Sequence, residues 1–142
     1  MNFVMPQIMN YNKLYQKIHE NSSAYRKNNQ GLILFDIWSK YVQLTSPILD
    51  VGCGNGKLCD LLCKDYEVIG IDVVNGIYDR IGYNYVQMDA TSEIWPFEDK
   101  MFSVSLCFDV LEHLKETDIS IVLNELIRVS KVQILSIAQL KR

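Results

Sequence analysis

The sequence predicts an α/β fold with a parallel sheet, because short apolar segments alternate with segments of helical periodicity. Two of the apolar segments, Ile48–Asp50 and Tyr66–Asp72, each end in an acid. Glycines at positions 52, 54 and 56 follow the first of them, and an apolar-periodic helix begins directly afterwards. A strand, a tight glycine loop and a helix in this order form the βα turn of a cofactor site.

The glycine loop suits a ligand that lies against bare main chain. Glycine adopts positive φ without strain, and the N–H groups that begin the next helix point toward a carboxylate or phosphate. A lone Gly-x-Gly pattern is equally compatible with an ordinary turn. The second acid-terminated strand favours the cofactor site, because Asp72 stands where a ribose-binding carboxylate belongs. Lys57 occupies the third glycine position of the dinucleotide fingerprint, which disfavours NAD and flavin dinucleotides.

Further segments with strand or helix character continue the alternation. Only eleven residues separate Asp72 from Asn84, so any crossover helix between them should be one or two turns long. Thr117 is the expected N-cap of the last helix. The other predicted elements are an amphipathic helix at 8–20, a helix that follows Gly31, includes Val42 and stops before Thr45, a helix at 58–62, strands at 84–88, 102–108 and 132–137, and a helix at 117–129.

Four segments together resemble the class I S-adenosylmethionine-dependent methyltransferases, in particular the small-molecule, methyltransferase-11-like branch. They are Ile48–Leu58, Gly70–Asp72, Met88–Ala90 with Trp95–Phe97, and Phe108–Leu114. They occur in the order of that family, and the resemblance covers roughly residues 48–137. It implies a Rossmann-like three-layer sandwich with sheet order 3-2-1-4-5. It also implies an N-terminal helical cap at 1–46 and an S-adenosylmethionine-binding domain at 47–142 that apparently lacks the family's C-terminal strands.

The resemblance implies contacts to the methionine and ribose parts of S-adenosylmethionine. Gly52 and Gly54, with Cys53 between them, would meet the methionine part of the cofactor. Asp50 would orient this loop or the ammonium group of the methionine. Asp72 would accept hydrogen bonds from both ribose hydroxyls, because a carboxylate can accept two such bonds in one plane.

The adenine and the methyl group would lie at neighbouring strand ends. Val73 would cover one adenine face, Asp89 would accept a hydrogen bond from the adenine amino group, and the backbone N–H of Ala90 would contact the ring. Phe108 ends the strand that faces the transferred methyl in this family. The short segment after Asp72 makes the wall beside the adenine differ from the family pattern.

The segment that follows the fourth strand contains two candidate catalytic residues. Asp109 and His113 are four positions apart and would share one face if a helix begins at this point, with Glu112 between them. An acid and an imidazole near the methyl group could act as a general base pair. The structural alternative is that Asp109 caps a helix and His113 packs against the protein.

The function implied is methyl transfer from S-adenosylmethionine to a small-molecule acceptor. Such an in-line displacement requires mainly that donor and acceptor are held in line without water. The main alternative is a catalytically inactive S-adenosylmethionine- or nucleotide-binding module, or a partner subunit of another protein. A dinucleotide oxidoreductase domain is the third alternative, disfavoured by Lys57.

Charge and hydropathy limit the classes of partner that the protein is expected to bind. The net charge is −3, and residues 1–46 contribute five basic and two acidic side chains, which leaves −6 for the rest. This distribution lacks the dense basic stripe of a nucleic-acid-binding protein, although it could suit an anionic substrate. No apolar run approaches the ~18 residues of a membrane span, and no signal pattern begins the sequence, which predicts a cytoplasmic protein.

The four cysteines, Cys53, Cys59, Cys63 and Cys107, lack the paired spacing of a zinc site. We expect buried thiols in a reducing compartment and no bound metal. The outer edge of the fifth strand would invite pairing with another chain, which leaves an oligomer open.

Overall fold

The computed structural model describes residues 30–74 and 82–137. The helix expected at 8–20 lies outside the described residues, as does most of the segment between Asp72 and Asn84.

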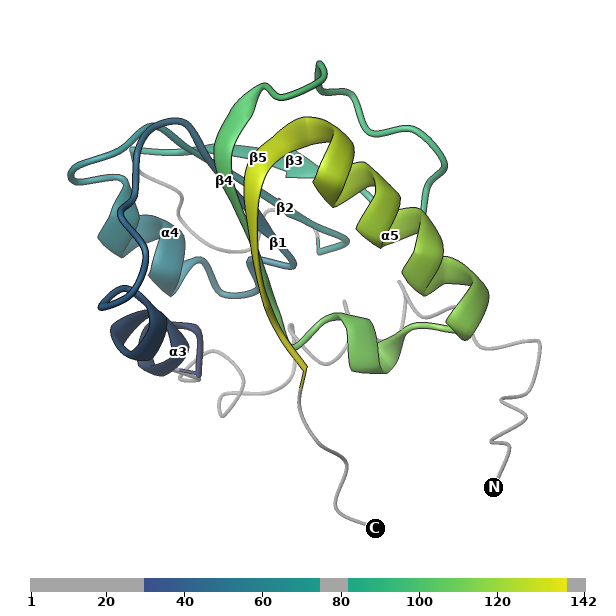
Figure 1. The fold of residues 1–142 in the computed structure, drawn as a ribbon, viewed down its shortest axis with the longest axis horizontal. Coiled ribbons are helices and arrows are strands. Elements are labelled where there is room, and N and C mark those ends of the chain that lie inside the picture. Colours follow the sequence, from purple (N-terminus) through teal and green to yellow (C-terminus); the bar gives the residue numbers. More distant parts are fainter. Residues whose placement is uncertain (1–29, 75–81, 138–142) are drawn as a thin grey trace, which may run out of the picture.

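Five parallel strands form one sheet in the order β3-β2-β1-β4-β5, which confirms the predicted topology (Figure 1). In the central strand, Ile48 pairs with Val68 on one side and with Val104 on the other. All four residues of this strand are buried, as expected for a parallel sheet that is covered on both faces. The strands are β1 (Ile48–Val51), β2 (Val68–Asp72), β3 (Asn84–Gln87), β4 (Phe102–Phe108) and β5 (Ser130–Ser136).

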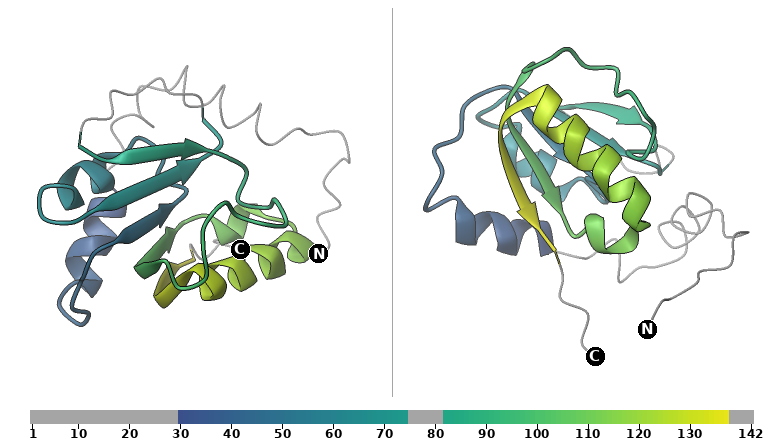
Figure 2. Two further views of the ribbon diagram at one scale, coloured as in Figure 1. Left: turned by 90° about the horizontal axis from the view of Figure 1, so that it is seen from above. Right: turned by 45° about the vertical axis from the view of Figure 1, so that its right-hand side comes forward.

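Helices cover both faces of the sheet and give the predicted three-layer sandwich (Figures 1 and 2). Helices α3 (Gln30–Trp38) and α4 (Lys57–Leu62) lie on one face, and α5 (Glu116–Val129) lies on the other. A 3₁₀ helix, η1 (Leu111–His113), connects β4 to α5. None of the helices in the described part of the chain is both long enough and apolar enough to span a bilayer.

The alternation of side chains along β4 builds the two cores. Val104, Leu106 and Phe108 point into the core beneath α3 and α4, whereas Cys107 points into the core beneath α5. This period of two is that of an extended strand. Phe102, the first residue of β4, departs from the alternation and also packs in the core beneath α5.

Two predicted helix ends are wrong. Helix α3 ends at Trp38 instead of Val42, because the N–H of Tyr41 bonds to the carbonyl of Trp38 in a turn and the Tyr41 side chain is 84% exposed. Helix α5 begins at Glu116 with Lys115 at the N-cap, so Thr117 lies in the first turn and is not the N-cap.

The strand ends also differ slightly from the predicted ones. β4 has the predicted bounds, but β2 begins at Val68 and β3 ends at Gln87. β5 begins at Ser130, directly after the last residue of α5, and Ser130 pairs with Phe102. The helix therefore passes into the strand without a loop.

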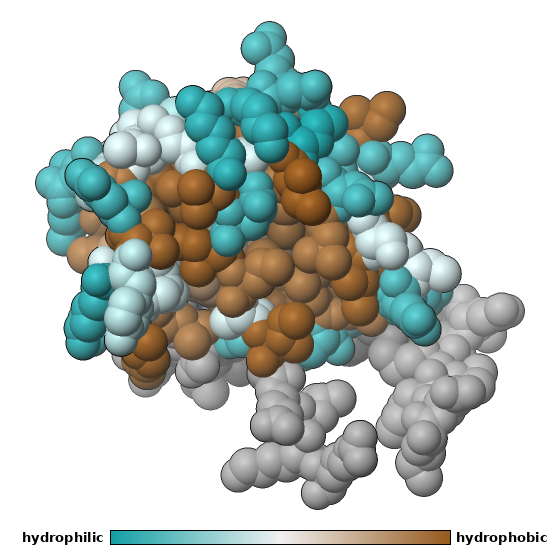
Figure 3. All heavy atoms as spheres, in the orientation of Figure 1, coloured by the Kyte–Doolittle hydropathy of each residue, from teal (hydrophilic) through white to brown (hydrophobic). Residues whose placement is uncertain are grey.

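β5 pairs with β4 along one side, within the described residues. Apolar atoms gather across the face on which β5 lies in front (Figure 3). Exposed apolar side chains of β5 include Val132 and Leu135, at 44% and 41% exposure.

Candidate functional site

The glycine loop leaves the carboxyl end of β1, between the two strands that flank β1 in the sheet. The chain continues to β2 on one side, and β4 lies on the other, so the loop is at the topological switch point where open α/β sheets bind ligands. The N–H groups of Gly52 and Cys53 both donate to the carbonyl of Ile71, at 2.8 and 3.1 Å. These bonds fix the start of the loop against β2.

The loop glycines adopt backbone conformations that other residues rarely adopt. The φ angles are 72° at Gly52, 55° at Gly54 and 77° at Gly56. A Cβ atom on Gly52 would collide with the side chain of Val110, and one on Gly56 would collide with the hydroxyl of Tyr83. Conformation and crowding therefore both require glycine at positions 52 and 56.

Asp72 joins the end of β2 to the glycine loop. Its Oδ2 accepts a hydrogen bond from the N–H of Gly54 at 2.8 Å, and its Oδ1 accepts one from the N–H of Val73 at 2.7 Å. A carboxylate oxygen can accept more than one hydrogen bond, so these contacts leave acceptor capacity for hydroxyl groups. Of the predicted cofactor-binding residues, the structure brings Gly54, Asp72 and Val73 into direct contact.

The segment after β2 is tied to β3. The hydroxyl of Tyr85 donates to the carbonyls of Asp72 and Val74, and the side-chain amide of Gln87 donates to the carbonyl of Val73 at 3.1 Å. These contacts hold the backbone that follows the Asp72 side chain.

Asp50 lies beneath the loop with only 3% of its surface exposed. The thiol of Cys59 donates to its Oδ2 at 3.4 Å. Burial raises the pKa of Asp50 to about 7; the Cys59 hydrogen bond opposes this rise, and the nearby charge of Asp72 adds to it. The Asp50 carboxylate therefore joins the end of β1 to α4 through the Cys59 thiol.

Two thiols pack beside Asp50. A Cβ atom on Gly70 would lie 2.9 Å from the Sγ of Cys53 and 3.1 Å from that of Cys59, so glycine at position 70 makes room for both. The pKa of the Cys59 thiol is raised well above its usual value, first by its hydrogen bond with Cys53 and then by burial. None of the cysteines in the described residues forms a disulfide, and all but Cys63 are buried.

Asp89 forms a tight turn just beyond β3. Its Oδ1 accepts hydrogen bonds from the N–H and the hydroxyl of Thr91, at 2.9 and 2.7 Å. The carbonyl of the next residue, Ala90, accepts a hydrogen bond from the indole N–H of Trp95 at 2.9 Å. Because Asp72 pairs with Gln87, Asp89 lies two residues beyond the strand neighbour of Asp72, at the same edge of the sheet.

Asp109 follows β4 with a φ of 55°, which is unusual for a residue other than glycine. Its N–H donates to the carbonyl and the hydroxyl of Ser136, both at 3.2 Å, and the Ser136 hydroxyl donates back to its Oδ1 at 3.2 Å. Phe108, just before it, is buried with its ring 5.7 Å from that of Trp38.

The helix that would place Asp109 and His113 on one face does not begin at Asp109. Only Leu111–His113 is helical, the N-cap position belongs to Val110, and His113 is exposed. Asp109 consequently does not cap this helix, and the i,i+4 argument does not apply to the pair.

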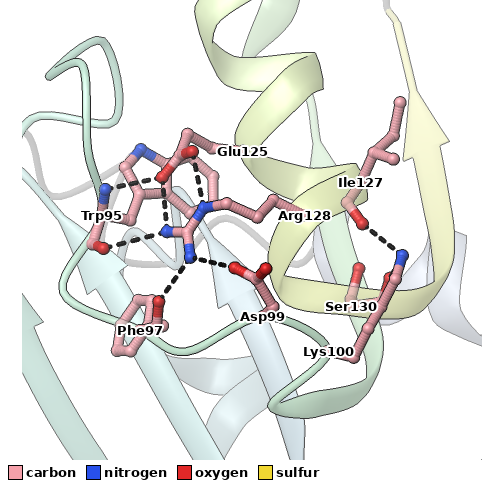
Figure 4. Close-up of polar contacts among 8 residues, drawn as sticks. All are labelled: Trp95, Phe97, Asp99, Lys100, Glu125, Ile127, Arg128 and Ser130. Atoms are coloured by element: carbon pink, nitrogen blue, oxygen red, sulfur yellow. Dashed lines mark hydrogen bonds and ion pairs between the residues drawn. The ribbon is translucent and has the colours of Figure 1, made fainter.

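A polar cluster that the sequence pattern does not predict lies on the α5 side of the sheet (Figure 4). Glu125 and Arg128 of α5 hold the backbone of Trp95 and Phe97, which belong to the loop between β3 and β4. The charge pair at i,i+3 is visible in the sequence, but its loop partners are about thirty residues away. The pKa of Glu125 is lowered, and the largest cause is the hydrogen bond that its carboxylate accepts from Arg128.

This fold and site define a Rossmann-like domain with a glycine loop at its switch point. A methyltransferase domain family model matches residues 48–133, more than half of the chain. The chain belongs to this methyltransferase domain family, and its architecture is that of the class I S-adenosylmethionine-dependent methyltransferases.

Two solved structures and one further protein are similar to this chain. The PH0226 protein of Pyrococcus horikoshii is 26% identical with a TM-score of 0.66, and the match covers 93% of this chain and 63% of that chain. A SAM-dependent methyltransferase of Methanosarcina mazei is 28% identical with a TM-score of 0.53, over 67% of this chain and 52% of that chain. The uncharacterized protein MJ0638 of Methanocaldococcus jannaschii is 33% identical over 84 residues, which are 59% of this chain and 36% of the relative.

Proposed function

We propose that the chain binds S-adenosylmethionine across the carboxyl ends of β1, β2 and β3 and transfers its methyl group to a small-molecule acceptor. The observation that carries this proposal is the hydrogen bond between Asp72 and the glycine loop at the switch point of the sheet. The family match over 48–133 and the similarity to the Methanosarcina mazei methyltransferase support the same cofactor.

The residues present fit this cofactor. A ribose diol donates two hydrogen bonds, and Asp72 offers two carboxylate oxygens that each hold one backbone N–H in the structure. The loop at Gly52 and Gly54 presents backbone at positive φ, where the methionine part could approach closely. When bound, the cofactor supplies an electrophilic methyl group on a sulfonium.

The adenine contacts of the proposal fall on the turn after β3. Asp89 would accept from the adenine amino group while its bonds to Thr91 fix the orientation of the carboxylate. The backbone N–H of Ala90 would contact the ring, and Val73, whose carbonyl Gln87 holds, would cover one adenine face. Cys53 would meet the methionine part of the cofactor together with Gly52 and Gly54, and Asp50 would orient this loop or the ammonium group of the methionine.

Asp109 and His113 are the proposed catalytic residues, with Phe108 beside the methyl group. Ser136 holds Asp109 at the carboxyl end of β4, so the orientation of this acid depends on β5. Since methyl transfer is an in-line displacement, the main requirement is alignment. A general base contributes when the acceptor carries a proton of high pKa, as an alcohol or a phenol does.

The proposed domain division places the cap at 1–46 and the cofactor-binding domain at 47–142. Within the described part of the cap range, α3 packs on α4, with the Gly31 Cβ position 3.7 Å from the Cβ of Leu58. Helix α3 would therefore contribute to the acceptor side of the site through Trp38, which contacts Phe108.

Calorimetric titration with S-adenosylmethionine, S-adenosylhomocysteine and NAD tests the proposed cofactor. We expect the first two to bind and NAD not to bind, and binding of NAD alone would overturn the proposal. Turnover is then measured as S-adenosylhomocysteine formed in the presence of small alcohols, phenols and amines. Cofactor binding without turnover on any acceptor would favour the inactive binding module instead.

A further inference from the structure

The loop between β3 and β4 is held in place by side chains of α5. We use the term Arg128 latch for Glu125 and Arg128 together with the backbone groups of Trp95 and Phe97 that they bind. In Figure 4 the guanidinium of Arg128 lies between the Glu125 carboxylate and the loop. The latch therefore joins the helix to a loop that has no regular secondary structure.

Glu125 binds both the loop and the arginine. Its surface is only 7% exposed, and its Oε2 accepts a hydrogen bond from the N–H of Trp95 at 2.6 Å. The Nε and one terminal nitrogen of Arg128 donate to the two carboxylate oxygens, each at 2.8 Å. This two-point contact fixes the plane of the guanidinium as well as its position.

Arg128 uses its remaining donors on the loop backbone. One terminal nitrogen donates to the carbonyl of Trp95 at 3.0 Å, and the other donates to the carbonyl of Phe97 at 2.7 Å. Asp99, which is 80% exposed, accepts a further bond at 3.0 Å. A lysine at this position could not make these contacts at once, because its single ammonium lacks the planar fork.

Trp95 carries the effect of the latch to the end of β3. Its side chain is 1% exposed and packs in the core beneath α5, so it cannot move independently of its backbone. Its indole N–H donates to the carbonyl of Ala90 at 2.9 Å. Ala90 directly follows Asp89, so the latch reaches the proposed adenine contacts through one buried side chain.

The helix that bears the latch is itself fixed to the sheet. The hydroxyl of Ser130 donates to the carbonyl of Leu126 at 2.6 Å and lies 2.7 Å from the hydroxyl of Ser105 in β4. Because α5 passes into β5 without a loop, Arg128 stands two residues from a strand position. The guanidinium is therefore anchored to the sheet rather than to a movable surface helix.

We propose that Arg128 is a positioning residue for the adenine part of the cofactor, acting through Glu125, Trp95 and Ala90. The inference rests on the proposed function, because it assumes that Asp89 and Ala90 face the adenine. It assigns to Arg128 the selection of adenine over other purines. Arg128 itself touches no part of the ligand in this mechanism.

The test compares two probes that differ at the purine only, S-adenosylhomocysteine and S-inosylhomocysteine. Hypoxanthine has a carbonyl where adenine has its amino group, so it loses the donor that adenine offers to Asp89 at this position. A hydrogen bond to a charged group contributes enough for the unaltered protein to prefer the adenine probe about 10- to 150-fold. Arg128→Met removes the hydrogen bonds from the guanidinium to the loop, and Trp95→Phe removes the hydrogen bond from the indole to Ala90. Both should reduce this preference to less than about 3-fold, mainly by weakening binding of the adenine probe.

Lys100→Met is the matched control for a merely structural role. Lys100 ties the same loop to the end of α5 through the carbonyls of Ile127 and Ser130, at 2.5 and 3.1 Å, and reaches neither Trp95 nor Phe97. This variant should lower the melting temperature yet keep the full purine preference. All titrations are made well below the melting temperature of each variant.

The outcomes separate the two proposals. Failure of the unaltered protein to bind S-adenosylhomocysteine overturns the proposed function. Normal binding with an unchanged purine preference in Trp95→Phe, or a preference lost equally in Lys100→Met, overturns the positioning role and leaves the cofactor assignment standing. If Arg128→Met does not fold, Trp95→Phe alone decides between these results, because it removes the Ala90 hydrogen bond and leaves the ion pair in place.

Discussion

Asp50 should make the protein less stable as the pH rises from about 4 to about 7. Its pKa in the folded state is raised to about 7, mainly by burial, whereas an aspartate in an unfolded chain titrates near 3.9. Between these two values the folded state binds a proton that the unfolded state has lost. The free energy of unfolding must therefore fall with rising pH in this window and level off above it.

The magnitude follows from the size of the shift. Each pKa unit corresponds to about 1.36 kcal/mol, so a shift of about 3 units gives a loss of about 4 kcal/mol between pH 4 and pH 7. This loss is a large fraction of the ~5–15 kcal/mol that stabilises a typical domain. The effect should be visible without any ligand.

Urea unfolding of the protein and of Asp50→Asn, at half-unit steps from pH 4 to pH 7.5, isolates this contribution. The amide is neutral at every pH, so the difference in unfolding free energy between the two proteins should change by about 1.4 kcal/mol per pH unit in the window. Asp65→Asn, at an exposed position, is the control for the replacement of an aspartate by asparagine as such. A difference for Asp50→Asn that does not vary with pH would refute the reasoning.

Three further predictions concern the site. Asp72→Ala should weaken cofactor binding by about 1.5–3 kcal/mol in calorimetry, the range for a hydrogen bond that involves a charge, and unchanged affinity in the folded variant would contradict the ribose role. Gly52→Ala should lower the melting temperature because its Cβ would meet Val110, and Val110→Ala should restore part of the loss; no recovery would point to the φ of 72° as the whole cause. His113→Ala should lower turnover by about 10²–10⁴-fold with nearly unchanged cofactor affinity if His113 is a base, whereas an intact rate would remove it from the site.

The sheet could be predicted because its signals are local. Apolar runs that end in an acid mark β1 and β2, and right-handed crossovers leave few orders for the remaining strands. The bounds of β4 match because Phe102 and Phe108 are buried aromatic residues at the two ends of the strand. The Gly54 contact of Asp72 agrees with the prediction that glycine loop and acid lie together.

The helix ends could not be predicted because apolar periodicity continues beyond the residues that pack. Tyr41 keeps the spacing of Trp38 and Phe35 closely enough to extend the pattern, yet its side chain points into solvent. At the start of α5, Thr117 has the better capping side chain, but the carbonyl of Lys115 accepts the first helical bonds.

The catalytic segment and the Arg128 latch depend on contacts between distant residues. The left-handed conformation of Asp109 is fixed by Ser136, 27 residues later, and nothing near Asp109 in the sequence predicts it. Similarly, the sequence pattern suggests only that Glu125 is an exposed i,i+3 partner of Arg128. In the fold, Glu125 also accepts a hydrogen bond from the backbone of Trp95. Single residues of this kind carry no periodic signal.

The crowding at the glycine loop has a consequence for how such motifs vary. Val110 occupies the place that a side chain at position 52 would need, and the Tyr83 hydroxyl does the same at position 56. These two glycines are thus required by the protein's own side chains, whether or not a ligand is near. Among relatives, we expect a larger residue at position 52 to be accompanied by a smaller one at position 110, and one at position 56 by the loss of the tyrosine hydroxyl. Positions 52 and 110 should therefore vary together among relatives, and so should positions 56 and 83.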